Sequence, residues 1–181
     1  MDSYFADRWK PVLEANGLAD FDAIWNLDIG WFEPKNERRG GWSGVSRLSV
    51  RLPDGSGAWV FVKRQENHVF RSWRRPLRGE ATLVREMKNL LRCRRLGIPV
   101  YEPILFAQHG GGKRAILLTQ ELTGYRSLAE LTDQWRESGW PARPERARII
   151  EEVAKAAALL HRHHLQHNCL FPKHIFIRQQ G

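Results

Sequence analysis

The sequence predicts an α+β protein whose first part is rich in strands and whose last part is helical. Between about residues 40 and 65 the pattern takes the period of two that is typical of strands, a stretch of helical periodicity follows, and two short apolar runs at 104–107 and 115–118 predict further strands. From Ser127 onward the apolar residues recur at helical spacing. We therefore expect a β-rich lobe with one long helix, followed by a lobe built from helices.

Composition sets the broad class. With 181 residues, 42% of them hydrophobic, the chain can bury one core or two small lobes. It has no apolar run near the roughly 20 residues that cross a bilayer and no secretory leader, so we expect a cytoplasmic protein without a transmembrane segment. Its two cysteines, Cys93 and Cys169, predict neither a disulfide framework nor a zinc pattern.

The first thirty residues predict two short helices. Asp2 or Ser3 would cap the first and Asp20 the second. Their apolar residues recur at helical spacing: Phe5, Trp9, Val12 and Leu13, then Phe21, Ile24 and Trp25.

A hairpin follows. Residues 45–50 and 59–63 alternate as strands, and residues 53–57 (PDGSG) form the turn between them. Three glycines precede the first strand and would give the hairpin a glycine-rich leading loop: Gly40, Gly41 and Gly44.

The remaining elements are one helix, two strands and two more helices. Residues 82–96 show a helical stripe that Gly97 and Pro99 end, and residues 104–107 and 115–118 predict strands joined by a turn at 109–112. A short helix is expected at 128–135. A longer helix should then bury one side, which carries Ile149, Ile150, Val153, Ala157 and Leu160.

Positive charge is concentrated in the middle of the chain. The formal net charge is +9 and the pI about 10.1. Such a patch favours nucleic acid, phospholipid headgroups or a phosphorylated substrate, although a solvated basic face without a ligand remains an alternative. The basic residues from 63 to 95 are Lys63, Arg64, Arg71, Arg74, Arg75, Arg78, Arg85, Lys88, Arg92, Arg94 and Arg95.

Three features in this order fit phosphoryl transfer from a nucleotide. That chemistry needs a glycine loop over the phosphates, a lysine that reaches them from a strand and a carboxylate that holds the lysine. Gly40, Gly41 and Gly44 supply the loop, Lys63 ends the strand WVFVK, and Glu86 lies on the following helix. Each feature alone is usually a hairpin loop or a solvated charge, so the interpretation rests on their joint order.

Longer stretches resemble a known family. WVFVK, the helix around Glu86 and AILLTQEL resemble the protein-kinase-like architecture. More narrowly, VREMKNLLRCRRLGIPVYEP, ILLTQEL and LHRHHLQHNCLFPKHIFI resemble the lipopolysaccharide kinase family, the Kdo kinase, WaaP and InaA group, and within it the InaA-like branch. The resemblance covers the chain from about Gly40 onward and implies a protein-kinase-like α+β fold with a β-rich lobe at 35–122 and a partial helical C-terminal lobe at 123–181. The two helices predicted before it would form an N-terminal extension at 1–34.

The resemblance also implies a reaction. It would be ATP-dependent phosphoryl transfer to a sugar hydroxyl of the lipopolysaccharide core, Kdo or heptose, at the cytoplasmic face of the inner membrane. Lys63 would bind the phosphates, Glu86 would hold Lys63, and the backbone at Glu121 and Leu122 would meet adenine. The expected partners are an anionic saccharide and, peripherally, the membrane surface, while nucleic acid ranks last because no nucleic-acid motif is present.

The histidine-rich end carries the kinase catalytic loop in an altered form. In the frame from His167 to His174, Cys169 stands at the aspartate position and Asn168 at the arginine position, while His174 takes the metal-side place. A thiol replaces a carboxylate poorly, so activity should be lowered unless His164 or His167 serves as the base. A zinc site and a helix end without chemistry stay open as alternatives.

The expected cofactors are ATP and Mg²⁺, but the metal site is incomplete. The family pattern continues to an aspartate-containing metal segment, and the last aspartate here is Asp133. We expect either a fragment of a longer protein or a truncated relative. The balance leans toward an ATP-dependent phosphotransferase, with a catalytically impaired pseudokinase or regulatory module as the alternative.

Overall fold

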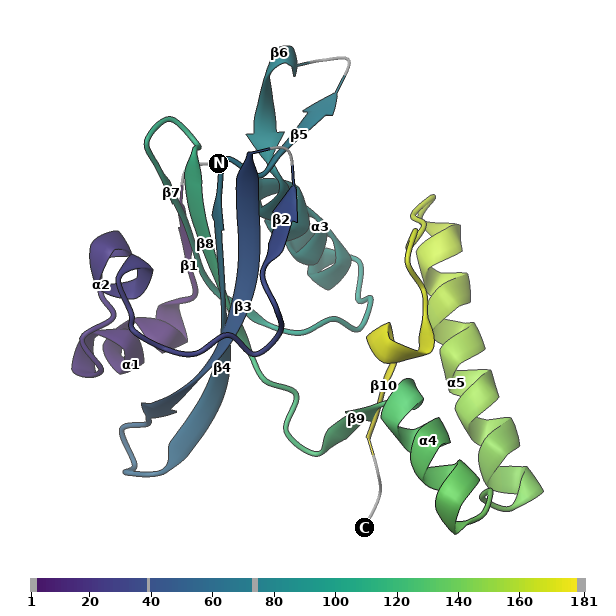
Figure 1. The fold of residues 1–181 in the computed structure, drawn as a ribbon. Helices are drawn as coiled ribbons and strands as arrows, with labels where there is room; N and C mark the ends of the chain where they lie inside the picture. The colour runs from purple at the N-terminus through teal and green to yellow at the C-terminus, as the bar shows by residue number, and fades with distance from the viewer. Residues whose placement is uncertain (1–2, 39, 73–74, 179–181) are drawn as a thin grey trace. The chain divides into compact units, whose positions relative to one another are not determined.

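A computed structural model describes residues 3–38, 40–72 and 75–178 (Figure 1). The chain forms two compact units, residues 1–93 with 100–121 and residues 94–99 with 122–181. Both helices and strands are present, which confirms the α+β prediction. The elements in chain order are β1 (Ser3–Phe5), η1 (Asp7–Trp9), α1 (Lys10–Ala15), α2 (Phe21–Trp25), β2 (Asn36–Arg38), β3 (Gly41–Arg51), β4 (Gly57–Glu66), β5 (Val69–Ser72), β6 (Arg75–Ala81), α3 (Thr82–Arg95), β7 (Pro103–His109), β8 (Arg114–Gln120), β9 (Tyr125–Ser127), α4 (Leu128–Ser138), α5 (Arg143–Arg162), η2 (Pro172–His174) and β10 (Phe176–Arg178).

The first unit is built on an antiparallel sheet with the strand order β1-β7-β8-β4-β3-β2. The β3–β4 hairpin, with its turn at 53–57, and the β7–β8 hairpin confirm the predicted strands. Helix α3 confirms the predicted helix and follows β6 directly. Because β4 and β8 lie inside the sheet, their side chains alternate between its two faces.

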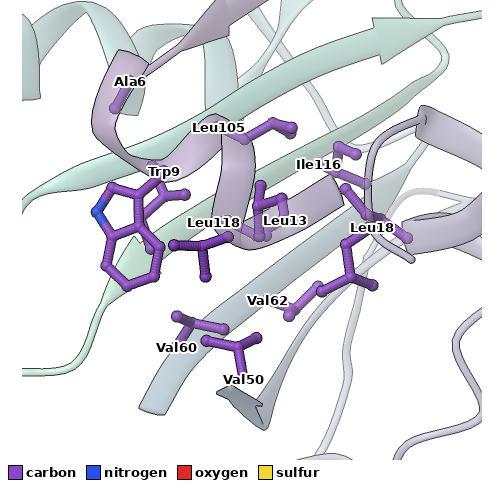
Figure 2. Close-up of a cluster of buried hydrophobic side chains, with 13 residues drawn as sticks. Ala6, Trp9, Leu13, Leu18, Val50, Val60, Val62, Leu105, Ile116 and Leu118 are labelled. Atoms are coloured by element: carbon purple, nitrogen blue, oxygen red, sulfur yellow. The ribbon is translucent and has the colours of Figure 1, made fainter. Parts of the chain in front are cut away.

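Helices cover the two faces of this sheet (Figure 1). On one face the N-terminal helices pack on β3, β4 and β8, and Figure 2 shows Trp9 and Leu13 turned toward Val60, Val62 and Leu118. On the other face the apolar side of α3 packs on the strands. That second cluster consists of Ala81, Leu83, Val84, Met87, Leu90, Phe106, Ala115 and Leu117.

The N-terminus differs from the prediction in one respect. Asp2 lies outside the described residues, and Ser3 does not cap a helix but lies with Phe5 in β1, where Ser3 pairs with Ala107 of β7. The edge of β7 thereby gains hydrogen-bonding partners, a non-local gain that helical periodicity does not reveal. Asp20 caps α2 as predicted, because its carboxylate accepts the Ala23 N–H at 2.8 Å.

The arginine-rich connection after β4 contains a hairpin that the sequence did not predict. Strands β5 and β6 pair as a separate two-stranded sheet. Arg74 and the side chains of Arg71, Arg75 and Arg78 lie outside the described residues, so this part of the predicted basic patch has no structural account here.

The second unit contains α4, α5, η2 and the small sheet β9–β10. Ser127 and Glu130 form a capping box at the start of α4. Both predicted helices are present, but the predicted burial of α5 is wrong: none of its residues, all of which are described, is buried, and Ile150 is 69% exposed. Ile149, Val153, Ala157 and Leu160 are half-buried, so the apolar side of α5 is only partly covered. In the described part of the chain, no helix is long and apolar enough to cross a membrane.

Candidate active site

Lys63 lies on the α3 face of the sheet. It is opposite Val45 on β3 and Leu117 on β8, and Leu117 belongs to the cluster that packs against α3. Along β4 this face changes from closed to open, because Gln65 is fully buried whereas Trp59 is 43% exposed. Lys63 therefore stands at the border between a packed and an accessible surface.

Helix α3 brings Glu86 to Lys63. The Lys63 Nζ donates to Glu86 Oε1, and the two side chains are 23% and 30% exposed. The buried residues of the helix, among them Leu83, Met87 and Leu90, hold its apolar side on the sheet. Glu86 lies beside this stripe, which orients its carboxylate toward β4.

Tyr101 is a third member of this group, and the sequence reasoning missed it. Its hydroxyl donates to Glu86 Oε1 at 2.6 Å, and Lys63 Nζ lies 3.4 Å from the same hydroxyl. Lys63 Nζ is also 5.3 Å from the centroid of the Tyr101 ring. The residue comes from the segment between α3 and β7. No spacing rule links it to Glu86, and the available signal was only a tyrosine two residues before a buried strand.

Gln65 is the second residue that the sequence reasoning missed. Its side-chain oxygen accepts the Leu83 N–H at 3.0 Å and the Thr82 hydroxyl at 2.6 Å, so it satisfies the first turn of α3. Its amide nitrogen donates to the His68 carbonyl at 2.7 Å. Strand β4 thus holds α3 at Gln65 and at Lys63. A glutamine within a buried strand was the signal that could have found it.

The surroundings keep both Lys63 and Tyr101 protonated at neutral pH. Burial disfavours the charged form of Lys63, but the Glu86 carboxylate and Tyr101 outweigh this effect and hold the pKa of Lys63 above its ordinary value. Burial, aided by Glu86 and opposed by Lys63, raises the pKa of Tyr101 to about 12. The group therefore presents a fixed ammonium, which suits an anionic ligand such as phosphate.

The three glycines occupy different positions. Gly40 has φ +75° in the turn between β2 and β3, and no atom lies near the space where a side chain would begin. Gly41 and Gly44 lie within β3, so the prediction that all three glycines form a loop ahead of the first strand is wrong for these two. A β-carbon at Gly41 would overlap the Asn67 carbonyl, and one at Gly44 would overlap the Trp31 ring. Close packing inside the first unit therefore favours glycine at both strand positions.

An aromatic surface continues from Lys63 toward the start of β4. Phe61 lies on the Lys63 face, and the Phe32 ring contacts it edge to face at 5.2 Å between centroids. Next to it, the Arg47 guanidinium stacks 3.9 Å from the Trp59 ring and pairs with Glu121 at 2.9 Å. Phe32 and Trp59 are 57% and 43% exposed, so this surface is open to a flat ligand.

The two residues predicted to meet adenine fall on either side of the boundary between the units. Glu121 ends the first unit, and its N–H donates to the Trp59 carbonyl at 3.0 Å. Leu122 begins the second unit, and its carbonyl accepts the Tyr125 N–H at 3.2 Å.

The predicted catalytic loop forms a closed turn in the second unit. The His174 Nδ1 lies 2.6 Å from the Cys169 carbonyl, which only accepts, so Nδ1 carries the proton. The His167 ring lies 5.9 Å from the His174 ring, and His167, Asn168 and Cys169 are exposed. His174, five places after Cys169, therefore closes the loop by donating to the Cys169 carbonyl.

These loop residues do not fit a metal ion. Among the residues that the structure describes, no three His, Cys, Asp or Glu side chains converge, and this finding speaks against the zinc alternative. Mg²⁺ prefers oxygen ligands, whereas Cys169 and His174 offer sulfur and nitrogen. The described residues therefore do not supply a magnesium site by themselves.

Comparison with known proteins first defines the class. The solved structure of "WaaP in complex with acyl carrier protein" matches with a TM-score of 0.58 at 21% identity, covering 90% of this chain and 57% of that one. The fold is thus kinase-like, and the chain spans little more than half of that structure.

The family follows from two sequence matches. The family model described as "Lipopolysaccharide kinase (Kdo/WaaP) family" matches residues 22–181. Protein InaA of Escherichia coli (strain K12) is 30% identical over 165 residues, which are 90% of this chain and 73% of that protein. The chain belongs to the lipopolysaccharide kinase (Kdo/WaaP) family, which confirms the resemblance seen in the sequence.

Proposed function

We propose that this protein transfers a phosphoryl group from ATP to a hydroxyl of Kdo or heptose in the anionic core of lipopolysaccharide. The observation that carries the proposal is the Lys63–Glu86–Tyr101 group at the border of an open sheet face. In this proposal residues 35–122 bind the nucleotide, residues 123–181 begin the acceptor lobe, and residues 1–34 are an extension. Family membership and the kinase-like fold support the reaction class.

Different residues of the first unit would contact the phosphates and the base of the nucleotide. The Lys63 ammonium would bind the phosphates while Glu86 keeps it in place. Phe61 and Phe32 lie one pleat farther along the same face, where a base would stack on their rings. The Gly40–Gly44 segment would lie over the phosphates, and the backbone at Glu121 and Leu122 would meet the base edge. ATP, when bound, supplies the phosphoryl group.

The acceptor side rests on the second unit. His167 and Cys169 are exposed on the closed loop and would face the acceptor hydroxyl. A neutral imidazole accepts a proton near neutral pH more readily than an unactivated thiol, so His167 would be the better base. The excess positive charge supports an anionic saccharide at the cytoplasmic face of the inner membrane.

Lys63→Ala tests the proposal. The matched control is Lys88→Ala, which removes another lysine of the first unit that is paired with a glutamate, Glu80, at 2.6 Å. We expect Lys63→Ala to abolish ATP-dependent phosphate incorporation into lipopolysaccharide core oligosaccharide and Lys88→Ala to leave it within about twofold, because an exposed surface ion pair contributes little. Equal incorporation by wild type and Lys63→Ala would overturn the assignment.

A second function is favoured by Cys169. A thiol at the base position and the unsuitable metal donors fit an impaired pseudokinase that binds nucleotide without turning it over. Cys169→Asp separates the two functions, with Cys93→Asp as a control for added charge. If the protein is an impaired enzyme, Cys169→Asp raises phosphate incorporation. A regulatory module would bind ATP without turnover in both forms.

A further inference from the structure

Tyr101 makes a polar contact that packing does not require. Its ring lies against the cluster between α3 and the sheet, together with Leu91 and Val100. A phenylalanine would fill the same volume. The hydroxyl, however, points at Glu86 Oε1, the same oxygen to which Lys63 donates. One carboxylate oxygen thus accepts from two residues of different segments.

This arrangement solves a problem that ligand binding creates. When a phosphate draws Lys63 toward itself, Glu86 loses part of its compensating charge in a half-buried position. Leaving a carboxylate with too few donors is costly. The Tyr101 hydroxyl stays on the first unit beside Glu86 and can go on donating.

We propose that Tyr101 is a positioning residue for the phosphate-binding lysine. By holding the Glu86 carboxylate, Tyr101 keeps α3 in register and lets Lys63 turn an N–H toward a nucleotide phosphate. This inference rests on the proposed function, since it needs a phosphate ligand at Lys63. Lys63 Nζ, 3.4 Å from the Tyr101 oxygen, already lies within reach of both groups.

The raised pKa values agree with this role. Tyr101 has a pKa of about 12 and so remains a donor across the physiological range. Tyr101 itself contributes to the raised pKa of Lys63, so the protonation of the two groups is linked. Both groups act in their protonated forms, and the arrangement needs no proton transfer.

The test compares Tyr101→Phe with Tyr4→Phe in the full chain. Tyr4 is a matched control, because its ring is also partly buried against the same cluster. Calorimetric titration with ATP and with adenosine separates phosphate binding from base binding. We expect Tyr101→Phe to weaken ATP binding about three- to tenfold, the effect of one hydrogen bond of ordinary net strength, because the hydroxyl acts on the phosphate only through Glu86 and Lys63. Adenosine binding should stay within about twofold, as should both ligands with Tyr4→Phe.

Two results of the titration would overturn the role. One is unchanged ATP affinity in Tyr101→Phe. The other is an equal loss for ATP and adenosine, which would indicate a general structural defect.

A second measurement keeps the two proposals distinguishable. If the wild-type protein binds no ATP, the proposed function fails, and the Tyr101–Glu86–Lys63 coupling is judged by acetylation of Lys63 at pH 9, followed by peptide mass spectrometry with exposed Lys10 as the internal reference. Removing the hydroxyl should lower the pKa of Lys63 and speed its acetylation about threefold, which corresponds to half a pKa unit. Tyr4→Phe should leave the rate unchanged. An unchanged rate in Tyr101→Phe would refute the coupling.

Discussion

Substituting Gly44 by alanine tests whether glycine is needed at this position because the Trp31 ring packs against it. A β-carbon at residue 44 would overlap the six-membered part of the Trp31 ring, including Cη2 at 3.1 Å. The ring is 38% exposed and can move outward. In doing so it would leave the Arg64 guanidinium, 4.7 Å from its centroid, and the edge contact with Trp42 at 5.6 Å.

The expected loss follows from those two contacts. A cation–π contact is worth about 0.5–2 kcal/mol and an aromatic pair about 0.5–1.5 kcal/mol. Because the ring keeps part of both contacts after it moves, we expect Gly44→Ala to lower the free energy of unfolding by about 2 kcal/mol. Urea unfolding followed by far-UV circular dichroism measures this value.

A double-mutant cycle with Trp31→Ala isolates the cause. Without the Trp31 ring, Gly44→Ala should no longer destabilise the protein and should instead raise the free energy of unfolding by about 0.5–1 kcal/mol, because alanine in a strand is more favourable than glycine by about that amount. The reasoning is refuted if Gly44→Ala costs the same in both backgrounds. Loss of ATP affinity without loss of stability would instead indicate that Gly44 serves the nucleotide.

Three further predictions concern the same units. Gln65→Leu should destabilise the first unit by about 3 kcal/mol in urea unfolding, because Leu83 N–H and Thr82 lose a buried acceptor; a cost below about 1 kcal/mol would show that water replaces it. Ser127→Ala, which removes the cap of α4, should cost about 1 kcal/mol, and an unchanged midpoint would contradict the capping role. Tyr101 has its folded pKa raised from 10.0 to about 12, so its contribution is complete below pH 10 and is lost as pH rises toward 12. Unfolding free energies from pH 9 to 11.5 should therefore fall more steeply for wild type than for Tyr101→Phe. Parallel curves would show that ionisation of Tyr101 does not cause the loss of stability.

The elements that the sequence predicts are those with long, regular patterns. Strands β3, β4, β7 and β8 have seven or more residues each, with alternating or continuous apolar patterns long enough to be recognised, and α3 carries a full apolar stripe. Strands β1, β2 and β9 have three residues each. These strands form because a neighbouring strand offers hydrogen-bonding partners. That neighbour comes from another part of the chain, so the local sequence does not predict the pairing.

The site divides in the same way. Lys63 and Glu86 could be proposed because their order along a strand and a helix matches a known chemical requirement. Tyr101 could not, because its hydroxyl reaches Glu86 only through the path of the segment between α3 and β7. Gln65 gives only a weak signal in the sequence, because it is a single amide in a strand that otherwise buries mainly apolar groups.

The two faces of the sheet indicate where a ligand has room within the first unit. On the face of the N-terminal helices, even the charged Arg64 is buried, with its guanidinium bonded to the Trp25 and Leu27 carbonyls at 3.0 and 2.8 Å. That face is filled by the chain itself. On the opposite face, α3 covers the sheet only as far as Lys63, and the surface beyond, at Phe61 and Trp59, is accessible. A phosphate bound at Lys63 would therefore leave the rest of its nucleotide lying over Phe61 and Trp59, because α3 and the segment that carries Tyr101 occupy the other direction.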